Sequence, residues 1–336
     1  MRVTLKDISR ETGLSISTVS RALSRSKRTH TDTENVIFEC ATKLGYPFFN
    51  LKQSEKKLSV ALVTDYFEGE FYASLFQGFC KAACSIDAEI FLFELHNQKK
   101  KNYKKSTLEY LVELSKNYSA ICLFHPELGN FKHKDIIAAL GDYPVISLNP
   151  IQNPKLDTVT FDSYSGGYIV AKHFFELGYK KMGVISGPTN RVESLLRKNG
   201  FTDYISQKKG VNLVWDFKGD YTEKYGVKAF HNFKKSKIKD VAIFSSNDYT
   251  AFGFINSASQ SNYSIPNDFI IAGYDDMSFC KTFNPMLTSV NTDYNELGRV
   301  ALMLIKNRLE KKHSNYGHLN LVPVSLKQRN STKIHT

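Results

Sequence analysis

Short apolar runs alternate with amphipathic stretches between residues 60 and 274, and this alternation restricts the fold more than any other feature of the sequence. Runs rich in β-branched and aromatic residues predict strands at 60–64, 90–95, 120–124, 145–148, 158–161, 182–186, 242–246 and 269–274. Between them, apolar residues three and four positions apart predict helices such as 75–84, 108–114, 166–177 and 250–258. Strands that are apolar on both faces and separated by helices indicate parallel sheets covered by helices. More than six such units predict two α/β lobes, with a ligand crevice at the carboxyl ends of the strands.

The first 46 residues follow a helical pattern instead. A first helix is expected over 5–11, and Gly13 follows it in the position of a C-cap glycine. Ser15 is placed to cap a second helix, on which Val19 and Leu23 face inward together. A third helix is expected over 33–44, with helical spacing of Val36, Ile37, Cys40, Ala41 and Leu44. The sequence therefore predicts a small all-α head before the α/β body.

The second predicted helix turns a polar face outward. With its two apolar positions inward, the outer positions are Ile16, Ser17, Ser20 and Arg21. A helix that presents hydroxyls and an arginine, joined through a glycine turn to a preceding helix, has what a helix-turn-helix needs to read the major groove of DNA. Hydroxyls suit phosphates, and arginine suits guanine edges. The alternative is an ordinary amphipathic helix with a solvated face.

The charge of the chain agrees with a polyanionic partner. Its 45 Lys and Arg outnumber its 33 Asp and Glu, which gives a formal net charge of +12. Residues 1–57 hold 11 basic and 6 acidic side chains, so the head and the segment after it are basic out of proportion to their length.

Composition also restricts where the protein works. No apolar stretch approaches the roughly 18 residues of a membrane span, and charged residues stand where a signal peptide would be apolar, so a cytoplasmic protein is expected. The five cysteines are scattered and odd in number, which favours reduced thiols over a disulfide framework. Cys80 and Cys84 stand one helical turn apart and are expected to be buried core thiols rather than metal ligands.

Sequence motifs of enzymes are absent. The chain has no G-x-G-x-x-G, no P-loop, no G-x-S-x-G and no His/Cys spacing typical of a metal site. Asp275 and Asp276 are adjacent in sequence, which points their side chains in different directions. We therefore expect no catalytic residues, no metal and no cofactor.

The head resembles a known family. "TLKDISRETGLSISTVSRAL" (4–23) and "ATKLGY" (41–46) are similar to the DNA-binding head of the lactose and galactose repressor (LacI/GalR) family. The resemblance implies that the base-reading residues are Ile16, Ser17 and Arg21. It implies that the phosphate-binding residues are Ser15, Thr18, Ser20, Ser24 and Tyr46. The expected DNA partner is a pseudo-palindromic double-stranded operator, bound by a homodimer.

Some positions depart from the family pattern. Ser9 and Thr12 stand where the family usually has alanines, and His30 stands where it usually has a serine. The segment 47–58 is about three residues shorter than the family's hinge and lacks its A-R-x-L core. From the family resemblance, Leu51 is the residue expected to substitute for the hinge leucine that wedges into the minor groove.

The resemblance extends over the body. Ordered segments such as "VTFDSYSGGYIVAKHFFELGYKKMGVISGP" (159–188), "AIFSSNDYTAFG" (242–253) and "IPNDFIIAGYDDM" (265–277) are similar to the family's effector-binding domain. The implied domains are a helix-turn-helix head (1–46), a shortened linker (47–58) and an effector-binding and dimerisation domain of two periplasmic-binding-protein-like lobes (59–336). The implied effector is a small molecule, a sugar or sugar derivative. The alternatives are a purine or other non-sugar effector, or a sugar-binding protein without a regulatory role.

Family positions also imply a set of effector-binding residues. They are Tyr72, His125, Asp162, Arg191, Arg197, Tyr221, Asn247 and Asp275. Tyrosines can stack on the apolar face of a ring, and Asp275, Arg197 and Asn247 can each engage paired hydroxyls. Structural alternatives remain: the tyrosines can be packing aromatics, His125 can end a strand, and Asn247 with Asp248 can cap a helix. Asp275 and Arg197 are the two candidates that charge favours most.

Overall fold

The computed structural model describes residues 3–23, 31–46, 57–65, 69–95, 106–124, 133–150, 155–310 and 317–333. The chain divides into two compact units, Met1–Leu58 and Ser59–Thr336, which we call the head and the body. Each is described here by itself.

In its described residues the head contains three helices, α1 (Leu5–Thr12), α2 (Ile16–Leu23) and α3 (Thr31–Leu44). The Asp7 carboxylate accepts hydrogen bonds from the backbone N–H (2.8 Å) and the hydroxyl (2.7 Å) of Thr4, which stabilises the start of α1. Gly13 ends α1 in a left-handed conformation, with φ of 68°. The Ser15 hydroxyl accepts from the Thr18 N–H at 3.1 Å and so caps α2, as predicted.

The head core is built from all three helices. Its buried side chains are Ile8, Val19, Ala22, Leu23, Ile37, Cys40 and Ala41. The inward placement of Val19 and Leu23 is therefore confirmed. One apolar position is not in the core: Val36, counted in the apolar register of the third helix, is 52% exposed, because the neighbouring Ile37 takes the inward position on that turn.

In the described residues the body contains two six-stranded sheets, one in each lobe, which confirms the predicted fold class. The first sheet has the order β11-β5-β4-β3-β1-β2. Its strands are β1 (Leu58–Thr64), β2 (Ala88–Glu94), β3 (Ala120–Phe124), β4 (Val145–Ser147), β5 (Asp157–Phe161) and β11 (Leu319–Val322). The second sheet has the order β12-β10-β9-β8-β6-β7. Its strands are β6 (Lys181–Ser186), β7 (Asn212–Lys218), β8 (Val241–Ser245), β9 (Ile270–Asp275), β10 (Thr288–Asn291) and β12 (Ser325–Lys327).

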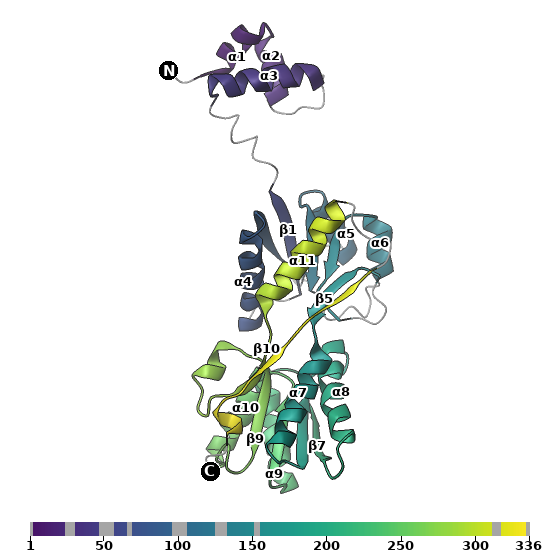
Figure 1. Ribbon diagram of the computed structural model, residues 1–336, viewed down its shortest axis with the longest axis vertical. Helices are drawn as coiled ribbons and strands as arrows, with labels where there is room; N and C mark the ends of the chain where they lie inside the picture. Colours follow the sequence, from purple (N-terminus) through teal and green to yellow (C-terminus); the bar gives the residue numbers. More distant parts are fainter. Residues whose placement is uncertain are drawn as a thin grey trace. The chain divides into compact units, whose positions relative to one another are not determined.

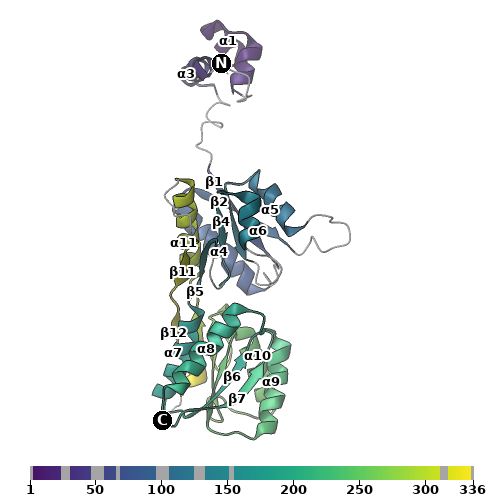
Figure 2. The ribbon, with the colours of Figure 1, turned by 90° about the vertical axis from the view of Figure 1, so that its right-hand side faces the viewer.

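Helices cover both faces of each sheet (Figure 2). In the first lobe, α4 (Glu70–Cys84) packs beside α11 (Tyr294–Leu309) on one face, and α5 (Thr107–Ser115) beside α6 (His133–Leu140) on the other. In the second lobe the pairs are α7 (Ser163–Glu176) with α8 (Val192–Ser206), and α9 (Glu223–Ser236) with α10 (Asp248–Gln260). Two short 3-10 helices, η3 (Ser278–Lys281) and η4 (Asn330–Thr332), also lie in the described part of the body.

The chain passes between the lobes three times in its described part. The crossings are β5 to α7, β10 to α11, and β11 to β12 (Figure 1). The central strands of both sheets pair in parallel, and β12 joins β10 antiparallel. Every predicted strand is present, whereas β7, β10, β11 and β12 were not predicted. β7 lies at a sheet edge with one buried residue, Trp215, and the other three are only three or four residues long, so none has a long apolar run.

Helices α7 and α8 pack unusually closely against each other. A Cβ on Gly167 would lie 1.8 Å from the carbonyl oxygen of Arg197, and a Cβ on Gly200 would lie 1.9 Å from that of Tyr164. The two helices therefore pack backbone to backbone, which holds Arg197 in place.

One cysteine prediction is wrong: Cys84 is exposed, because it stands at the end of α4, and Cys80 is only half-buried.

Candidate functional site: an effector cavity and a DNA-facing helix

A cavity of about 590 Å³ lies between the two lobes of the body. Phe124 at the end of β3, Phe161 at the end of β5 and Asp275 at the end of β9 line it. The cavity therefore opens at the carboxyl ends of the strands, where the alternating pattern predicted a ligand crevice.

Aromatic rings form much of the first lobe's side of the cavity. Phe71 lies 5.2 Å from Tyr72, 5.3 Å from Phe124 and 5.8 Å from Tyr294, measured between ring centroids. Phe161 lies 5.4 Å from Tyr294, nearly perpendicular to it. These contacts, tilted between Phe71 and Phe124 and edge-to-face in the others, hold the rings against each other and give the cavity an apolar wall that suits one face of a ligand ring.

A buried ion pair forms the charged part of the second lobe's side. Nη2 of Arg197 donates to Oδ1 of Asp275 at 3.2 Å, and the two side chains are 8% and 11% exposed. Nη1 of Arg197 donates to the carbonyl oxygen of Ser246 at 2.6 Å. Its guanidinium carbon lies 3.6 Å from the centroid of the Tyr274 ring, a cation–π contact. Burial raises the pKa of Asp275 to about 6, with the Arg197 charge opposing that rise.

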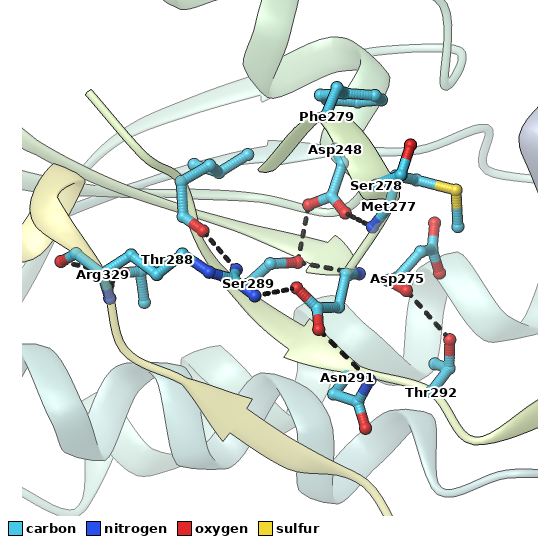
Figure 3. A network of polar contacts seen from close by, with 12 residues as sticks. Asp248, Asp275, Met277, Ser278, Phe279, Thr288, Ser289, Asn291, Thr292 and Arg329 are labelled. Atoms are coloured by element: carbon cyan, nitrogen blue, oxygen red, sulfur yellow. Dashed lines mark hydrogen bonds and ion pairs between the residues drawn. The ribbon is translucent and has the colours of Figure 1, made fainter. Parts of the chain in front are cut away.

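The two consecutive carboxylates at the end of β9, Asp275 and Asp276, point to different partners, as predicted from their adjacency. Asp276 accepts from Nη2 of Arg329 at 2.6 Å and from the Asn291 amide at 3.3 Å (Figure 3). Asp275 and Asp276 have φ values of 105° and 52°, in the left-handed region that side chains other than glycine rarely adopt. Backbone strain of this kind is concentrated at functional sites, and here it separates a cavity carboxylate from a structural one.

A second buried carboxylate, that of Asp248, holds the backbone beside the cavity. Its Oδ2 accepts from the backbone N–H of Met277 at 2.9 Å, and its Oδ1 accepts from the Ser289 hydroxyl at 2.6 Å (Figure 3). Burial raises the pKa of Asp248 to about 8. Met277 lines the cavity, so Asp248 fixes the position of a wall residue. Of the two residues considered as caps, only Asn247 caps α10, because the Asp248 side chain is used in this network.

The structure brings together most of the predicted effector-binding residues. Those that line the cavity are Tyr72, Arg191, Arg197, Tyr221, Asn247 and Asp275. Asp162 is not among the lining residues, because its carboxylate caps α7 and accepts from the Ser165 N–H at 3.0 Å. His125 lies outside the described residues.

The Asn247 amide is occupied by the protein at both ends. Its Oδ1 accepts from the Thr250 N–H at 3.1 Å, and its Nδ2 donates to the carbonyl oxygen of Tyr221 at 2.8 Å. Tyr221 has a left-handed φ of 73°, so this bond holds it in an unfavourable backbone conformation. Asn247 therefore positions Tyr221 in the cavity wall and does not offer a free bidentate amide.

Several lining residues were missed from the sequence. They are aromatic (Phe71, Phe124, Phe161, Tyr249, Tyr294), polar (Asn149, Thr160) or acidic (Glu193, Asp220, Glu223). The signal that could have found some of them is their position at or just after a strand: Phe124 and Phe161 end strands, and Asn149 follows β4 by two residues. Tyr294 comes from α11, which only the folded topology brings to the cavity.

Hydrogen bonds join the two lobes at the rim of the cavity. The Glu70 carboxylate, at the start of α4, accepts from the backbone N–H (2.5 Å) and the hydroxyl (2.8 Å) of Ser278 in η3. The backbone N–H of Glu70 donates to the Tyr249 hydroxyl at 3.1 Å. We call Glu70, Tyr249 and Ser278 the rim latch; it ties the first lobe to the second beside the lining residues Gly69 and Met277.

The predicted DNA-facing side of α2 is exposed in the head. Ile16 is 43% exposed, and Ser17, Ser20 and Arg21 are exposed as well. Nε of Arg21 donates to the carbonyl oxygen of Ser17 at 3.2 Å, one turn earlier. Ser15 is exposed and caps the helix, Thr18 is half-buried beside it, and Tyr46 packs against the head core. Ser24, His30, and the segment 47–56 with Leu51 lie outside the described residues.

The described part of the chain has no helix long and apolar enough to cross a membrane. Within those same residues, no group of three or more His, Cys, Asp or Glu side chains is arranged to hold a metal ion.

Comparison with protein families identifies the head and much of the body. The model of the bacterial regulatory proteins of the lacI family matches residues 4–47, and that of a periplasmic binding protein-like domain matches residues 171–332. The chain belongs to the lacI family. The family resemblance of the sequence is therefore confirmed.

Relatives of this lacI-family chain cover nearly its whole length. The HTH-type transcriptional repressor PurR of Haemophilus influenzae (strain PittEE) is 24% identical over 333 residues, 95% of this chain and 96% of the relative. Its name is that of a repressor, in agreement with the prediction that the chain is not an enzyme.

Solved structures show the same fold. The lac repressor dimer bound to operator and the anti-inducer ONPF gives a TM-score of 0.73 at 20% identity and covers 99% of both chains. A LacI family transcriptional regulator from Enterococcus faecium with bound ribose gives a TM-score of 0.67 at 20% identity, covering 82% of this chain and 98% of that one.

Proposed function

We propose that this lacI-family protein is a sequence-specific DNA-binding transcription repressor whose operator affinity is controlled by a small-molecule effector, a sugar or sugar derivative. In this proposal, residues 1–46 bind DNA, 47–58 form a shortened linker, and 59–336 bind the effector and form a homodimer. The dimer recognises a pseudo-palindromic operator, because two-fold symmetry of the protein requires two related half-sites.

The observation that carries the proposal is the exposed polar face of α2. Ser17 and Arg21 stand one turn apart on it, and no core contact explains their place on that side of the helix. Arginine discriminates guanine by two hydrogen bonds, while Ile16 offers methyl contacts and Ser17 a hydroxyl that pairs with several bases. Arg21 therefore supplies most of the direct base recognition, with Ser15, Thr18, Ser20, Ser24 and Tyr46 assigned to phosphates.

The cavity supports the effector part of the proposal. A ring stacked on the aromatic wall can place its hydroxyls toward Asp275, with Tyr72, Arg191 and Tyr221 around it. The bound ribose of the Enterococcus faecium regulator supports a sugar in this fold. A purine is the alternative effector, because a planar heterocycle also fits between aromatic rings.

Control of DNA binding follows from the two-lobed body. An effector that contacts both lobes stabilises one arrangement of them over another, and this changes the spacing of the two heads in a dimer. Such coupling is typically about 1 to 3 kcal/mol, which is about 5- to 150-fold in operator affinity. The sign of the change distinguishes an inducer from a corepressor.

The test starts by selecting duplexes from a random library with the full chain. Affinity for the selected duplex is then compared with affinity for a scrambled one, in the parent protein and in Arg21→Ala. Lys234→Ala, which removes an exposed cation from α9, is the matched control. We expect Arg21→Ala to lose the preference for the selected sequence while weak binding to all DNA survives. An equal loss on both duplexes would contradict a base-reading role.

A further inference from the structure

The main cation of the cavity is already committed to the protein. Both terminal nitrogens of Arg197 donate within the fold, one to Ser246 and one to Asp275, and its planar face lies on Tyr274. A phosphate or carboxylate is normally clamped by two such nitrogens at once. Asp275 therefore already neutralises the Arg197 charge that would attract such an anion.

The other charges of the cavity are mainly acidic. Among the described lining residues the basic ones are Arg191 and Arg197, and the acidic ones are Glu193, Asp220, Glu223 and Asp275. Glu193 lies close enough that its charge acts on Arg197, Tyr221 and Asp275. A phosphate dianion in this cavity would meet an excess of like charge in a partly desolvated site, where such repulsion is strong.

The remaining hydrogen-bonding capacity of Asp275 suits a ligand group that donates. Among the described residues, Oδ2 of Asp275 accepts no hydrogen bond, whereas its Oδ1 accepts from Arg197. A ligand hydroxyl can donate to Oδ2, whereas an ionised phosphate oxygen can only accept. Leaving the Asp275 oxygen without a donor would cost binding free energy.

We propose that the cavity is selective for an uncharged, hydroxyl-bearing ring and rejects its phosphorylated counterpart, with Asp275 and Glu193 as the discriminating residues. Asp275 contacts a ring hydroxyl directly. Glu193 acts through its charge on the same end of the cavity. This inference rests on the proposed effector function of the cavity and names the ligand class within it.

The experiment uses the full chain and matched ligand pairs, ribose with ribose 5-phosphate and glucose with glucose 6-phosphate, measured by calorimetric titration. The unphosphorylated member of a pair is expected to bind on the order of ten-fold more tightly than the phosphorylated one. Glu193→Gln removes one carboxylate and keeps its shape, so it should narrow the ratio between the affinities for the unphosphorylated and the phosphorylated sugar. Asp275→Asn should lower the affinity for the uncharged sugar itself.

The control is Glu296→Gln, which removes an exposed carboxylate of α11 that is paired with Arg299 and does not line the cavity. This control should leave the ratio between the affinities for the unphosphorylated and the phosphorylated sugar unchanged. The inference would be overturned if a phosphorylated sugar bound as tightly as its unphosphorylated counterpart, or more tightly. It would also be overturned if none of the four sugars bound. The DNA preference of the parent protein and its dependence on Arg21 are measured separately, so these results do not decide the DNA-binding part of the proposed function.

Discussion

The head and the cavity differ in whether their polar and charged side chains are exposed or buried. In the proposed function the head reads DNA with one eight-residue helix, on which Ser17 and Arg21 are exposed in a basic part of the chain. The cavity gathers side chains from segments more than 200 positions apart, buries them, and pairs its main cation internally. A polyanion such as DNA can be read by exposed cations, whereas a neutral ring in a buried site requires charges that are already neutralised.

The largest expected effect is on the buried pair of the cavity. Arg197→Ala leaves Asp275 buried and uncompensated, so the free energy of unfolding should fall by about 3 to 5 kcal/mol. Denaturant unfolding of the body measures it. Arg299→Ala, at an exposed ion pair, is the control and should leave the free energy of unfolding nearly unchanged. A loss below about 1 kcal/mol for Arg197→Ala would show that the pair is not an internally neutralised unit.

The next effect is on the head. Arg21→Ala should lower the preference for the selected operator over a scrambled duplex by about 1 to 3 kcal/mol, because a bidentate arginine contact to guanine is lost. Fluorescence anisotropy at fixed salt concentration measures both affinities. The stability of the head should be unchanged, because Arg21 is exposed. If stability falls along with binding, the effect on DNA is indirect.

The affinity of the cavity for a sugar should depend on pH. The pKa of Asp275 is raised to about 6, so the carboxylate that accepts a ligand hydroxyl is present above that pH and is lost as pH falls through it. As pH falls below 6, sugar affinity should fall by at most about ten-fold per pH unit. In Asp275→Asn the dependence should disappear. Calorimetric titrations with sugar from pH 5 to 8 measure this dependence. If the affinity of Asp275→Asn changed with pH as steeply as that of the parent, the dependence would belong to another titratable group.

The smallest expected effect concerns the rim latch. Ser278→Ala removes one of the two hydrogen bonds that Glu70 accepts across the lobes, an exposed contact worth about 1 kcal/mol. Sugar affinity should change by a few-fold, mainly through faster dissociation, which stopped-flow kinetics measures. Ser236→Ala, at the end of α9, is a serine control away from the cavity. Identical dissociation rates in the two variants would show that the latch does not hold the lobes together.

The head could be predicted almost entirely from the sequence. Helical spacing fixes which side of α2 faces the core, so the outer positions follow from Val19 and Leu23 alone. The failure at Val36 is local: spacing placed it with Ile37, and only the packed core shows which of two neighbours is inward.

The cavity could be predicted only in part. The alternating strands gave its place in the fold, and family positions gave Asp275 and Arg197. That these two bind each other could not be predicted, because they are 78 positions apart and meet only when α8 packs beside β9's end. The same holds for Asn247, whose amide is occupied by Tyr221 and Thr250, and for Glu193 and Tyr294, whose contact with the cavity depends on the packing of α8 and α11.

The measurement that tests the account most directly is operator affinity with and without an uncharged sugar that binds the cavity, in the parent protein and in Asp275→Asn. The account predicts a change of about 5- to 150-fold in the parent, and little change with the phosphorylated sugar or in the variant at the same ligand concentration. An equal change with the phosphorylated sugar, or an unchanged response in Asp275→Asn, would contradict it.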